Sequence, residues 1–155
     1  MKSIQKLSQF IENWLIKYIK KSKMDGFVIG VSGGIDSAVT STICARTGYP
    51  TLCLEMGIHQ NMSQVSRARK HIQWLEENYK NVSHYSLSLT KLFDEFCFTL
   101  PNEIDDNKKD LALANSRARL RMTTLYYFST INNYLVAGTG NKVEDFGIGF
   151  YTKYG

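Results

Sequence analysis

Residues 30–37, which read GVSGGIDS, constrain the fold of this chain more than any other segment. They follow a short apolar run at residues 27–29, and the residues after them can continue as a helix. A strand, a glycine-rich turn and a helix N-terminus form an anion cradle, because glycines let the backbone approach the anion and free N–H groups point at it. Ser32 and Ser37 add hydroxyl donors, and Asp36 adds a carboxylate that can hold a metal ion against a phosphate. The pattern therefore favours a phosphate site over a plain turn between a strand and a helix, and the missing lysine of the GxxxxGK[ST] pattern excludes a Walker loop.

Apolar periodicity predicts helices that alternate with strands along the rest of the chain. The expected strands are residues 27–31, 51–56, 82–87 and 134–137. The expected helices are residues 4–19, 36–47, 62–78 (with a capping box at Asn61 and Gln64), 89–96 and 111–132. Residues 102–110 are polar and without periodicity, so we expect a mobile loop there. This order indicates an α/β fold, a doubly wound parallel sheet with helices on both faces.

A second glycine-rich segment, residues 138–141, follows the fourth expected strand. In a sheet ordered 3-2-1-4, the first and fourth strands are neighbours, and the topological switch point lies between their carboxyl ends. The turn at residues 32–37 and the loop at residues 138–144 would then face one crevice. Two segments far apart in the chain are thereby predicted to form a single site.

The composition limits the class of protein. A chain of 155 residues is long enough for one domain with a core. The net charge is +5, and the basic residues cluster at residues 17–23, 67–70, 108–109 and 117–121. Such clusters suit a polyanionic ligand, either nucleotides or RNA, but solvated helix faces explain them equally well. No RNA-binding motif accompanies them, so a nucleic-acid partner is not expected.

The cysteines and histidines give no sign of a metal site or a disulfide. Cys44, Cys53 and Cys97 form no CxxC pair and have apolar neighbours, so we expect buried thiols in a reducing compartment. The three histidines share no ligand spacing and are expected at the surface or hydrogen-bonded. The apolar runs are too short to cross a bilayer, and the N-terminus has the pattern of an amphipathic helix rather than a signal peptide. The expected location is the cytoplasm, with no membrane partner.

The sequence SGGIDS at residues 32–37 resembles the PP-loop of the ATP pyrophosphatases, which bind the pyrophosphate of ATP and cleave ATP to AMP and pyrophosphate. Three later segments are similar, in order, to signatures of the ammonia-dependent NAD synthetase family: NSRARLRM at 115–122, VAGTGNKVE at 136–144 and GFYTKYG at 149–155. The resemblance covers nearly the whole chain and implies an adenine nucleotide alpha hydrolase-like fold. Residues 1–155 are then expected to form a single PP-loop ATP pyrophosphatase domain that is incomplete at its C-terminus.

The resemblance implies a ligase that amidates deamido-NAD to NAD. The nicotinate carboxylate of deamido-NAD attacks the α-phosphate of ATP, pyrophosphate leaves, and ammonia then displaces AMP. Mg²⁺ is the implied cofactor, and a homodimer is the implied assembly. No catalytic nucleophile of the protein is implied, because the substrate carboxylate is the attacking group.

The resemblance also implies roles for individual residues. Arg119 and Lys153 match contacts to deamido-NAD, and Asp36 and Glu144 match carboxylates that bind Mg²⁺. The implied ATP-binding residues are Gly30, Val31, Ser32, Gly33, Gly34, Ile35, Asp36, Ser37 and Thr139.

The face of the long helix that meets the substrates can be predicted from its spacing. Arg119 shares a helical stripe with Asn115, Met122 and Tyr126, so this stripe is expected to face the site. Arg117 and Arg121 are expected to point elsewhere, toward solvent.

Two departures from the family pattern affect these expectations. Gly57 stands where the family often has proline, which leaves the adenine pocket undefined. The glycine-rich stretch that follows residue 155 in the family is absent, so we expect this chain to bind ATP or pyrophosphate weakly and to make NAD negligibly. Two other functions stay open: a PP-loop tRNA-modifying enzyme, which the basic clusters favour weakly, and an inactive nucleotide-binding fragment.

Overall fold

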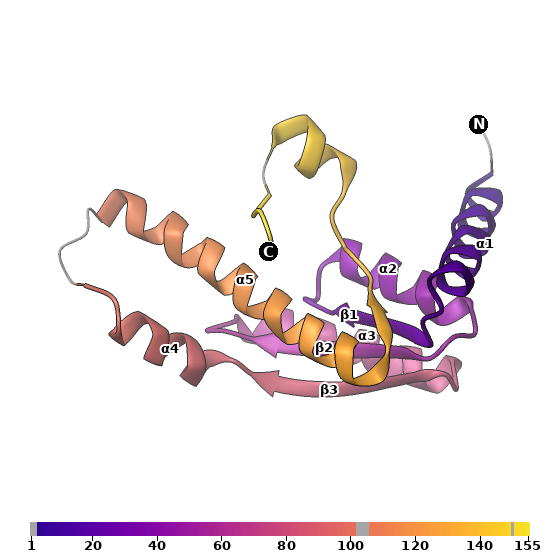
Figure 1. Ribbon diagram of the computed structural model, residues 1–155, viewed down its shortest axis with the longest axis horizontal. Coiled ribbons are helices and arrows are strands. Elements are labelled where there is room, and N and C mark those ends of the chain that lie inside the picture. The colour runs from indigo at the N-terminus through magenta and orange to yellow at the C-terminus, as the bar shows by residue number, and fades with distance from the viewer. Residues whose placement is uncertain (1–2, 102–105, 150) are drawn as a thin grey trace.

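Four parallel strands form a sheet in the order β3-β2-β1-β4 (Figure 1). The computed structural model describes residues 3–101, 106–149 and 151–155. Phe27 of the inner strand lies beside Thr51 on one side and beside Leu135 on the other. The predicted parallel sheet and its strand order are confirmed. The strands are β1 (Gly26–Gly30), β2 (Thr51–Gly57), β3 (Val82–Ser88) and β4 (Tyr134–Val136).

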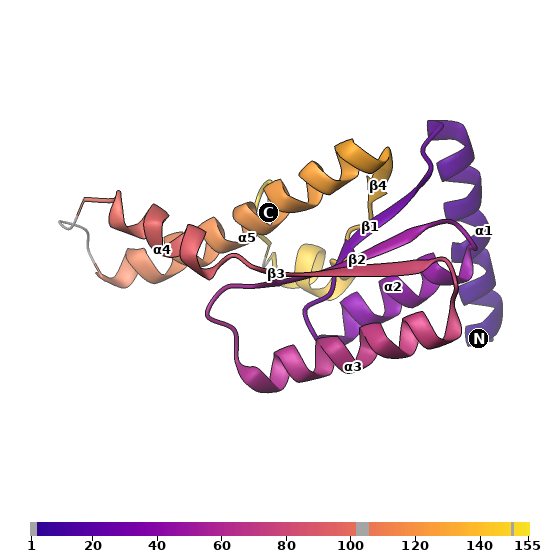
Figure 2. The ribbon, with the colours of Figure 1, turned by 90° about the horizontal axis from the view of Figure 1, so that it is seen from below.

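Helices cover both faces of the sheet (Figure 2). One face, with Phe27 and Ile29, packs against α1 (Ile4–Ser22), α2 (Ile35–Arg46) and α3 (Met62–Asn78). The opposite face, with Val28 and Leu54, packs against α4 (Thr90–Phe98) and α5 (Asp106–Asn132). Successive strand residues therefore alternate between two apolar layers, as in a parallel sheet that is buried on both sides. The predicted doubly wound α/β fold is confirmed.

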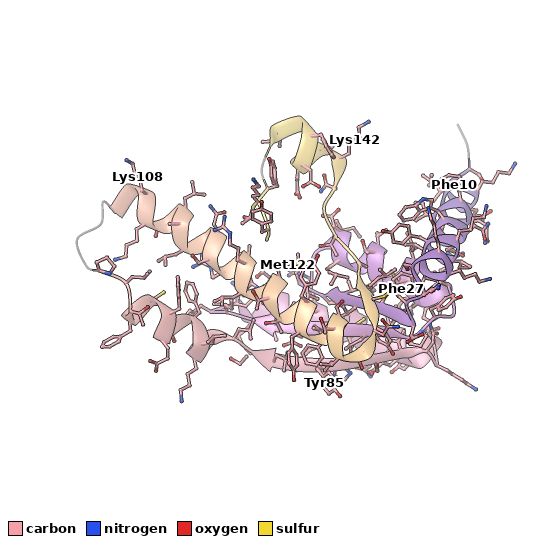
Figure 3. All side chains as sticks on the ribbon, viewed as in Figure 1. Phe10, Phe27, Tyr85, Lys108, Met122 and Lys142 are labelled. Atoms are coloured by element: carbon pink, nitrogen blue, oxygen red, sulfur yellow. The ribbon has the colours of Figure 1, made fainter. Side chains whose placement is uncertain are left out.

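The long helix α5 begins earlier than the sequence predicts. Residues 106–110 form its first turns, so the loop expected at residues 102–110 is wrong there, whereas residues 102–105 lie outside the described residues. This end of α5 extends beyond the sheet, as the position of Lys108 shows in Figure 3. Lys108 and Asp110 are exposed there, and an exposed helix end needs no apolar stripe, so the missing periodicity was a poor guide to the start of α5.

The predicted capping box at the start of α3 is only half formed. Asn61 is the N-cap, and its Oδ1 accepts a hydrogen bond from the backbone N of Ser63 at 2.9 Å. Among the described hydrogen bonds, none joins the Gln64 side chain back to Asn61. One side-chain acceptor therefore serves the free N–H groups of this helix end.

A buried carboxylate fixes α3 to the sheet, and local sequence gave no sign of it. Glu55 of β2 is 7% exposed and accepts hydrogen bonds from Nε and Nη2 of Arg69 at 3.1 and 3.3 Å. The Ser86 hydroxyl of β3 donates to the same carboxylate at 3.2 Å. Because α3 also carries residues that contact the glycine turn, this pair positions the site described below.

The predictions for the cysteines and histidines are confirmed except at Cys97, which is free but only partly buried. Cys44 and Cys53 are free and buried, and burial raises the pKa of both thiols to about 12. Each histidine has a side-chain partner: His59 with Asp94 at 2.6 Å, His71 with Ser41 at 2.9 Å, and His84 with Glu76 at 2.8 Å. Within the described ranges, no helix has both the length and the apolar character to cross a membrane.

Candidate functional site

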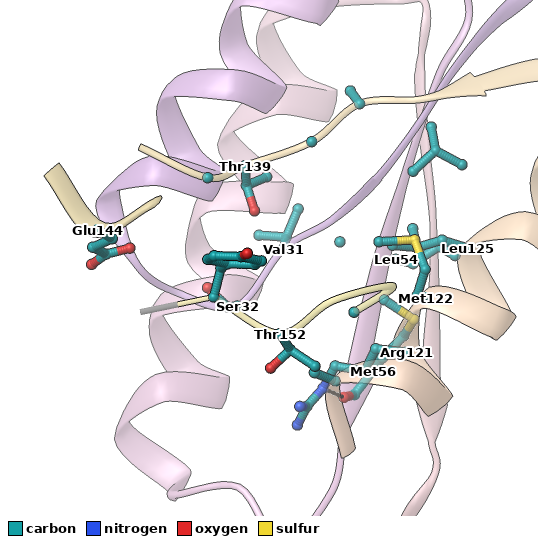
Figure 4. Close-up of a pocket in the computed structure, with 18 of the residues that line it drawn as sticks. Val31, Ser32, Leu54, Met56, Arg121, Met122, Leu125, Thr139, Glu144 and Thr152 are labelled. Atoms are coloured by element: carbon teal, nitrogen blue, oxygen red, sulfur yellow. Dashed lines mark hydrogen bonds between the residues drawn. The ribbon is translucent and has the colours of Figure 1, made fainter. Parts of the chain in front are cut away.

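A cavity of about 1080 Å³ opens at the carboxyl ends of the strands (Figure 4). The β1–α2 turn lines it with Gly30, Val31 and Ser32, and the segment after β4 lines it with residues 137–140. The two glycine-rich segments therefore meet in one crevice, as the strand order predicted. The C-terminal half of α5 and the residues around the chain end complete the walls.

The predicted site residues fall into three groups. Gly30, Val31, Ser32, Thr139 and Glu144 line the larger cavity. Gly33, Gly34 and Ile35 line a second cavity of about 300 Å³ behind the turn, together with Arg67 and His71. Four predicted residues line neither cavity: Asp36, Ser37, Arg119 and Lys153.

The side chains of Ser32 and Ser37 form hydrogen bonds within the turn that carries them. The Ser37 hydroxyl, which is buried, accepts from the backbone N of Ser32 at 3.2 Å and donates to the Gly34 carbonyl at 3.0 Å. The exposed Ser32 hydroxyl accepts from the backbone N of Gly34 at 3.2 Å and lies 3.2 Å from the Ser37 hydroxyl. Ser37 is thus a structural brace of the loop, whereas Ser32 can turn its hydroxyl toward a ligand in the cavity.

Backbone N–H groups supply most of the anion-binding capacity of the turn. Gly34 is the N-cap of α2, and the described hydrogen bonds give the N–H groups of Gly33, Ile35, Asp36 and Ser37 no acceptor within the protein. These groups lie at the positive end of the α2 dipole. The arrangement is suited to a phosphate and needs no lysine.

Two side chains outside the turn hold its carbonyl groups. Nε of Arg67 on α3 donates to the Gly33 carbonyl at 3.2 Å. Nε2 of Gln60, after β2, donates to the Ser32 carbonyl at 3.2 Å. With its carbonyl groups held from outside, the turn keeps its N–H groups directed toward a ligand. The sequence did not reveal either contact, because both residues are distant from the turn in the chain.

Replacing Arg67 by methionine is expected to weaken MgATP binding about fivefold. The loss of one hydrogen bond, worth about 1 kcal/mol, would leave the Gly33 carbonyl free to move. Calorimetric titration with MgATP measures the effect. The exposed Lys70 lies on the same helix, so Lys70→Met controls for the lost charge and should bind as the parent does. Equal affinities of the Arg67 and Lys70 variants would contradict the bracing role.

His71 supports the turn from behind. Its Nε2 lies 2.9 Å from the hydroxyl of Ser41, which is fully buried and donates to the Ser37 carbonyl at 2.7 Å. Because the Ser41 hydroxyl proton is engaged, Nε2 of His71 donates the hydrogen of this bond. Burial lowers the pKa of His71 below its ordinary value of 6.5.

The free energy of unfolding is therefore expected to fall as the pH falls below about 6.5. In that range the unfolded chain binds a proton at His71 that the folded chain does not, until the pH passes the lower folded-state pKa. The stabilisation is complete above pH 6.5 and is lost on acidification. Urea unfolding from about pH 5 to about pH 8 measures it. In His71→Gln the amide can still donate to Ser41, so its pH dependence should be shallower; an unchanged slope would contradict this role.

The second loop presents carboxylates to the cavity. The Asn141 side chain accepts from the backbone N of Val143 and of Glu144, both at 3.0 Å, and so starts a short π-helix, Val143–Ile148. This turn places Glu144 and Asp145 in the cavity wall, and Figure 4 shows Glu144 on the same cavity as Ser32 and Thr139. Asp145 was not among the predicted site residues, although its position next to Glu144 could have suggested it.

The carboxylates fit a metal ion that arrives with phosphate rather than a resident one. Among the described residues, no group of three or more Asp, Glu, His or Cys side chains could hold a metal alone. Mg²⁺ is commonly bound by one or two carboxylates together with substrate phosphates and water. Glu144 and Asp145 from one loop and Asp36 from the other are the side chains that could supply such oxygens.

The face of α5 that meets the cavity differs from the predicted one. Ala118, Arg121, Met122 and Leu125 line the cavity, so the expectation that Arg121 points to solvent is wrong. Tyr126, expected on the site face, is 59% exposed. Leu125 is buried against the sheet, and this packing sets the rotation of the helix.

Arg119 and Lys153 lie together outside the cavity lining. Nε of Arg119 donates to the Lys153 carbonyl at 3.2 Å. The neighbouring Thr152 hydroxyl donates to the Asn115 side chain at 2.7 Å. The two predicted deamido-NAD contacts are therefore adjacent, beside the wall of the cavity that Thr152 forms.

Comparison with known proteins gives a consistent result. Residues 7–155 match the family model of NAD synthase. The chain is 38% identical to the NH(3)-dependent NAD(+) synthetase of Mycoplasma genitalium, over 100% of this chain and 60% of that protein. It is 37% identical to the enzyme of the same name from Carboxydothermus hydrogenoformans, over 92% of this chain and 57% of that protein.

Solved structures resemble the whole chain. An NMN synthetase from Francisella tularensis has a TM-score of 0.89 and 33% identity, over 100% of this chain and 61% of that one. An NH3-dependent NAD synthetase from Campylobacter jejuni has a TM-score of 0.86 and 30% identity, over 100% of this chain and 64% of that one. The chain thus spans less than two thirds of the length of each of these four proteins.

Proposed function

The chain belongs to the NAD synthase family, and on that premise we propose that it carries the ATP-binding and metal-binding half of an ammonia-dependent NAD synthetase. The proposed reaction is the amidation of deamido-NAD to NAD with ammonia, through an adenylated nicotinate, with release of AMP and pyrophosphate. The observation that carries the proposal is the meeting of the two glycine-rich segments in one cavity at the strand switch point. The proposal treats residues 1–155 as one PP-loop domain.

The turn between β1 and α2 would hold the pyrophosphate part of ATP. The N–H groups of Gly33, Ile35 and Asp36 and the Ser32 hydroxyl would donate to phosphate oxygens. Because the turn is braced in advance, these donors could stabilise the charge that grows on the leaving pyrophosphate without reorganising. Thr139, from the opposite loop, would contact ATP across the cavity.

Asp36 and Glu144 would hold Mg²⁺ between the two loops. When bound, Mg²⁺ supplies positive charge that offsets the charge of the phosphates and of the leaving group. The described salt bridges include neither carboxylate, so both would be free to accept a metal ion.

Arg119 and Lys153 would bind deamido-NAD. Arg119 contacts the Lys153 backbone, and the Lys153 ammonium lies 5.0 Å from the centre of the Tyr154 ring. Two cationic side chains on adjacent residues beside the cavity would suit a dianionic dinucleotide. The attacking carboxylate belongs to the substrate, so the protein would position and stabilise rather than form a covalent bond.

The proposed assembly is a homodimer, and the proposed location is the cytoplasm. Apolar side chains are exposed on two helices: Ile4, Leu7, Phe10, Trp14 and Tyr18 on α1, and Tyr126 and Ile131 on α5. Exposed apolar patches of this kind usually mark interfaces. Free buried thiols are typical of a reducing compartment. Sedimentation at micromolar concentration tests the dimer, and a monomer there would contradict it.

A turnover assay tests the reaction. AMP release that requires both deamido-NAD and ammonia would support the proposal, whereas AMP release that requires tRNA would favour a tRNA-modifying enzyme. MgATP binding without turnover would reduce the proposal to a nucleotide-binding module. Because the Francisella protein is named an NMN synthetase, nicotinate mononucleotide is a second acceptor to compare with deamido-NAD.

A further inference from the structure

Arg121 occupies the cavity wall in a fixed orientation. Its Nε donates to the Met56 carbonyl at 3.0 Å, which ties α5 to the end of β2. Both residues line the cavity, and Figure 4 shows the guanidinium group beside Met56 and Thr152. One N–H of the group is thus used for anchoring, and the two NH₂ groups, with four N–H donors, remain for other partners.

Among the described residues, Arg121 forms no salt bridge. The described salt bridges join no carboxylate to Arg117, Arg119 or Arg121. Burial lowers the pKa of Arg121, and the charge of Arg117, one helical turn away, lowers it further. Arg117 itself lies 5.3 Å above the Phe93 ring. A partly buried guanidinium that has no carboxylate partner lowers the stability of the folded protein, unless a bound ligand supplies the missing contact.

The cavity has a polar end and an apolar end. Ser32, Gly138 and Thr139 form the polar end, and Ser32 is followed in the chain by the residues whose N–H groups we propose to bind phosphate. The apolar end is a slot between β1, β2 and α5, lined by Val31, Leu54, Met56, Met122, Leu125 and Val136. Arg121 lines the same cavity and is bonded to Met56 of this slot. If the triphosphate of a nucleotide binds at the polar end, its flat, weakly polar base can occupy the apolar slot.

We propose that Arg121 is a recognition residue for the purine base of ATP. This inference rests on the proposed ATP site. The Met56 carbonyl holds the plane of the guanidinium, and that plane contacts the face of the base in the apolar slot. A guanidinium stacks on an aromatic face, whereas the compact, strongly hydrated ammonium of lysine does not stack in this way.

The experiment compares two ligands that share a polyphosphate. MgATP and magnesium tripolyphosphate are titrated by calorimetry into the parent chain, Arg121→Met and Arg121→Lys. Both substitutions are expected to weaken MgATP binding about tenfold and to change tripolyphosphate binding less than about twofold. Lys108→Met, at the far end of α5, removes the same charge away from the cavity and should leave both affinities unchanged (Figure 3). Retained tripolyphosphate binding also shows that a variant is folded.

Three results would overturn the inference. In the first, both variants bind MgATP within about twofold of the parent. In the second, MgATP and tripolyphosphate are weakened equally, which makes Arg121 a phosphate contact or a structural one. In the third, the parent binds MgATP no more tightly than tripolyphosphate, which means that the base has no subsite. If the parent binds neither ligand, the proposed function fails as well.

Discussion

Replacing Gly33 by alanine is expected to abolish measurable MgATP binding. Gly33 has φ +83°, a backbone conformation that residues other than glycine rarely adopt. A Cβ there would lie 2.4 Å from the Gln64 carbonyl oxygen and 3.2 Å from the Ala68 N, and both belong to the backbone of α3. The turn would have to move away from α3 and would lose the arrangement of its N–H groups. Strain and overpacking together are expected to lower the free energy of unfolding by about 2–4 kcal/mol.

Gly48→Ala is the matched control for this substitution. Gly48 has φ +78°, but a Cβ there would meet nothing within 4 Å. Gly48→Ala therefore introduces the backbone strain without the collision. It should lower the free energy of unfolding by about 1 kcal/mol and leave MgATP binding unchanged. Calorimetric titration gives the affinities, and urea unfolding gives the stabilities. If Gly33→Ala binds MgATP as tightly as Gly48→Ala, the packing of the turn against α3 is not needed for binding.

Replacing Asp36 or Glu144 by alanine is expected to weaken Mg²⁺-dependent ATP binding by about 2–4 kcal/mol, or roughly 30- to 1000-fold. Each change removes one of the carboxylates that we propose to hold the metal ion between the loops. ATP binding in the presence of EDTA should change little, because the backbone N–H groups remain. Titrations with and without Mg²⁺ separate these effects.

Asp145 provides the decisive comparison for the metal ligands. It lies next to Glu144 and also lines the cavity, so either carboxylate of this loop could serve. If Asp145→Ala loses Mg²⁺ dependence and Glu144→Ala keeps it, the ligand is Asp145 and the assignment of Glu144 is wrong. Glu95→Gln, on the exposed side of α4, controls for the lost charge. If Asp36, Glu144 and Asp145 can each be replaced without effect, no metal ion is shared between the two loops.

The amino-acid sequence determined the order of the elements and the place where the two loops meet. Apolar runs such as residues 27–29 and 51–54 are buried on both sides, and this pattern identifies parallel strands. Strand order then fixes the switch point, because neighbouring parallel strands end at the same edge of the sheet. The short segments at residues 30–37 and 138–144 were enough to predict an anion-binding turn with nearby carboxylates, because the glycines and acidic residues stand next to one another in the chain.

Only the tertiary structure decided which side chains face the cavity. Each residue turns an α-helix by about 100°, so Arg119 and Arg121 lie on nearly opposite faces, and the rotation of the helix decides which of them meets the cavity. The rotation of α5 is set by Leu125 against the sheet, a contact that local spacing does not specify. Local sequence also does not specify the contacts of Arg67 and Gln60, which hold the carbonyl groups of the turn from other parts of the chain. Serines 32 and 37 could be recognised as polar groups of an anion site, but their roles depend on which acceptors the folded turn brings within reach.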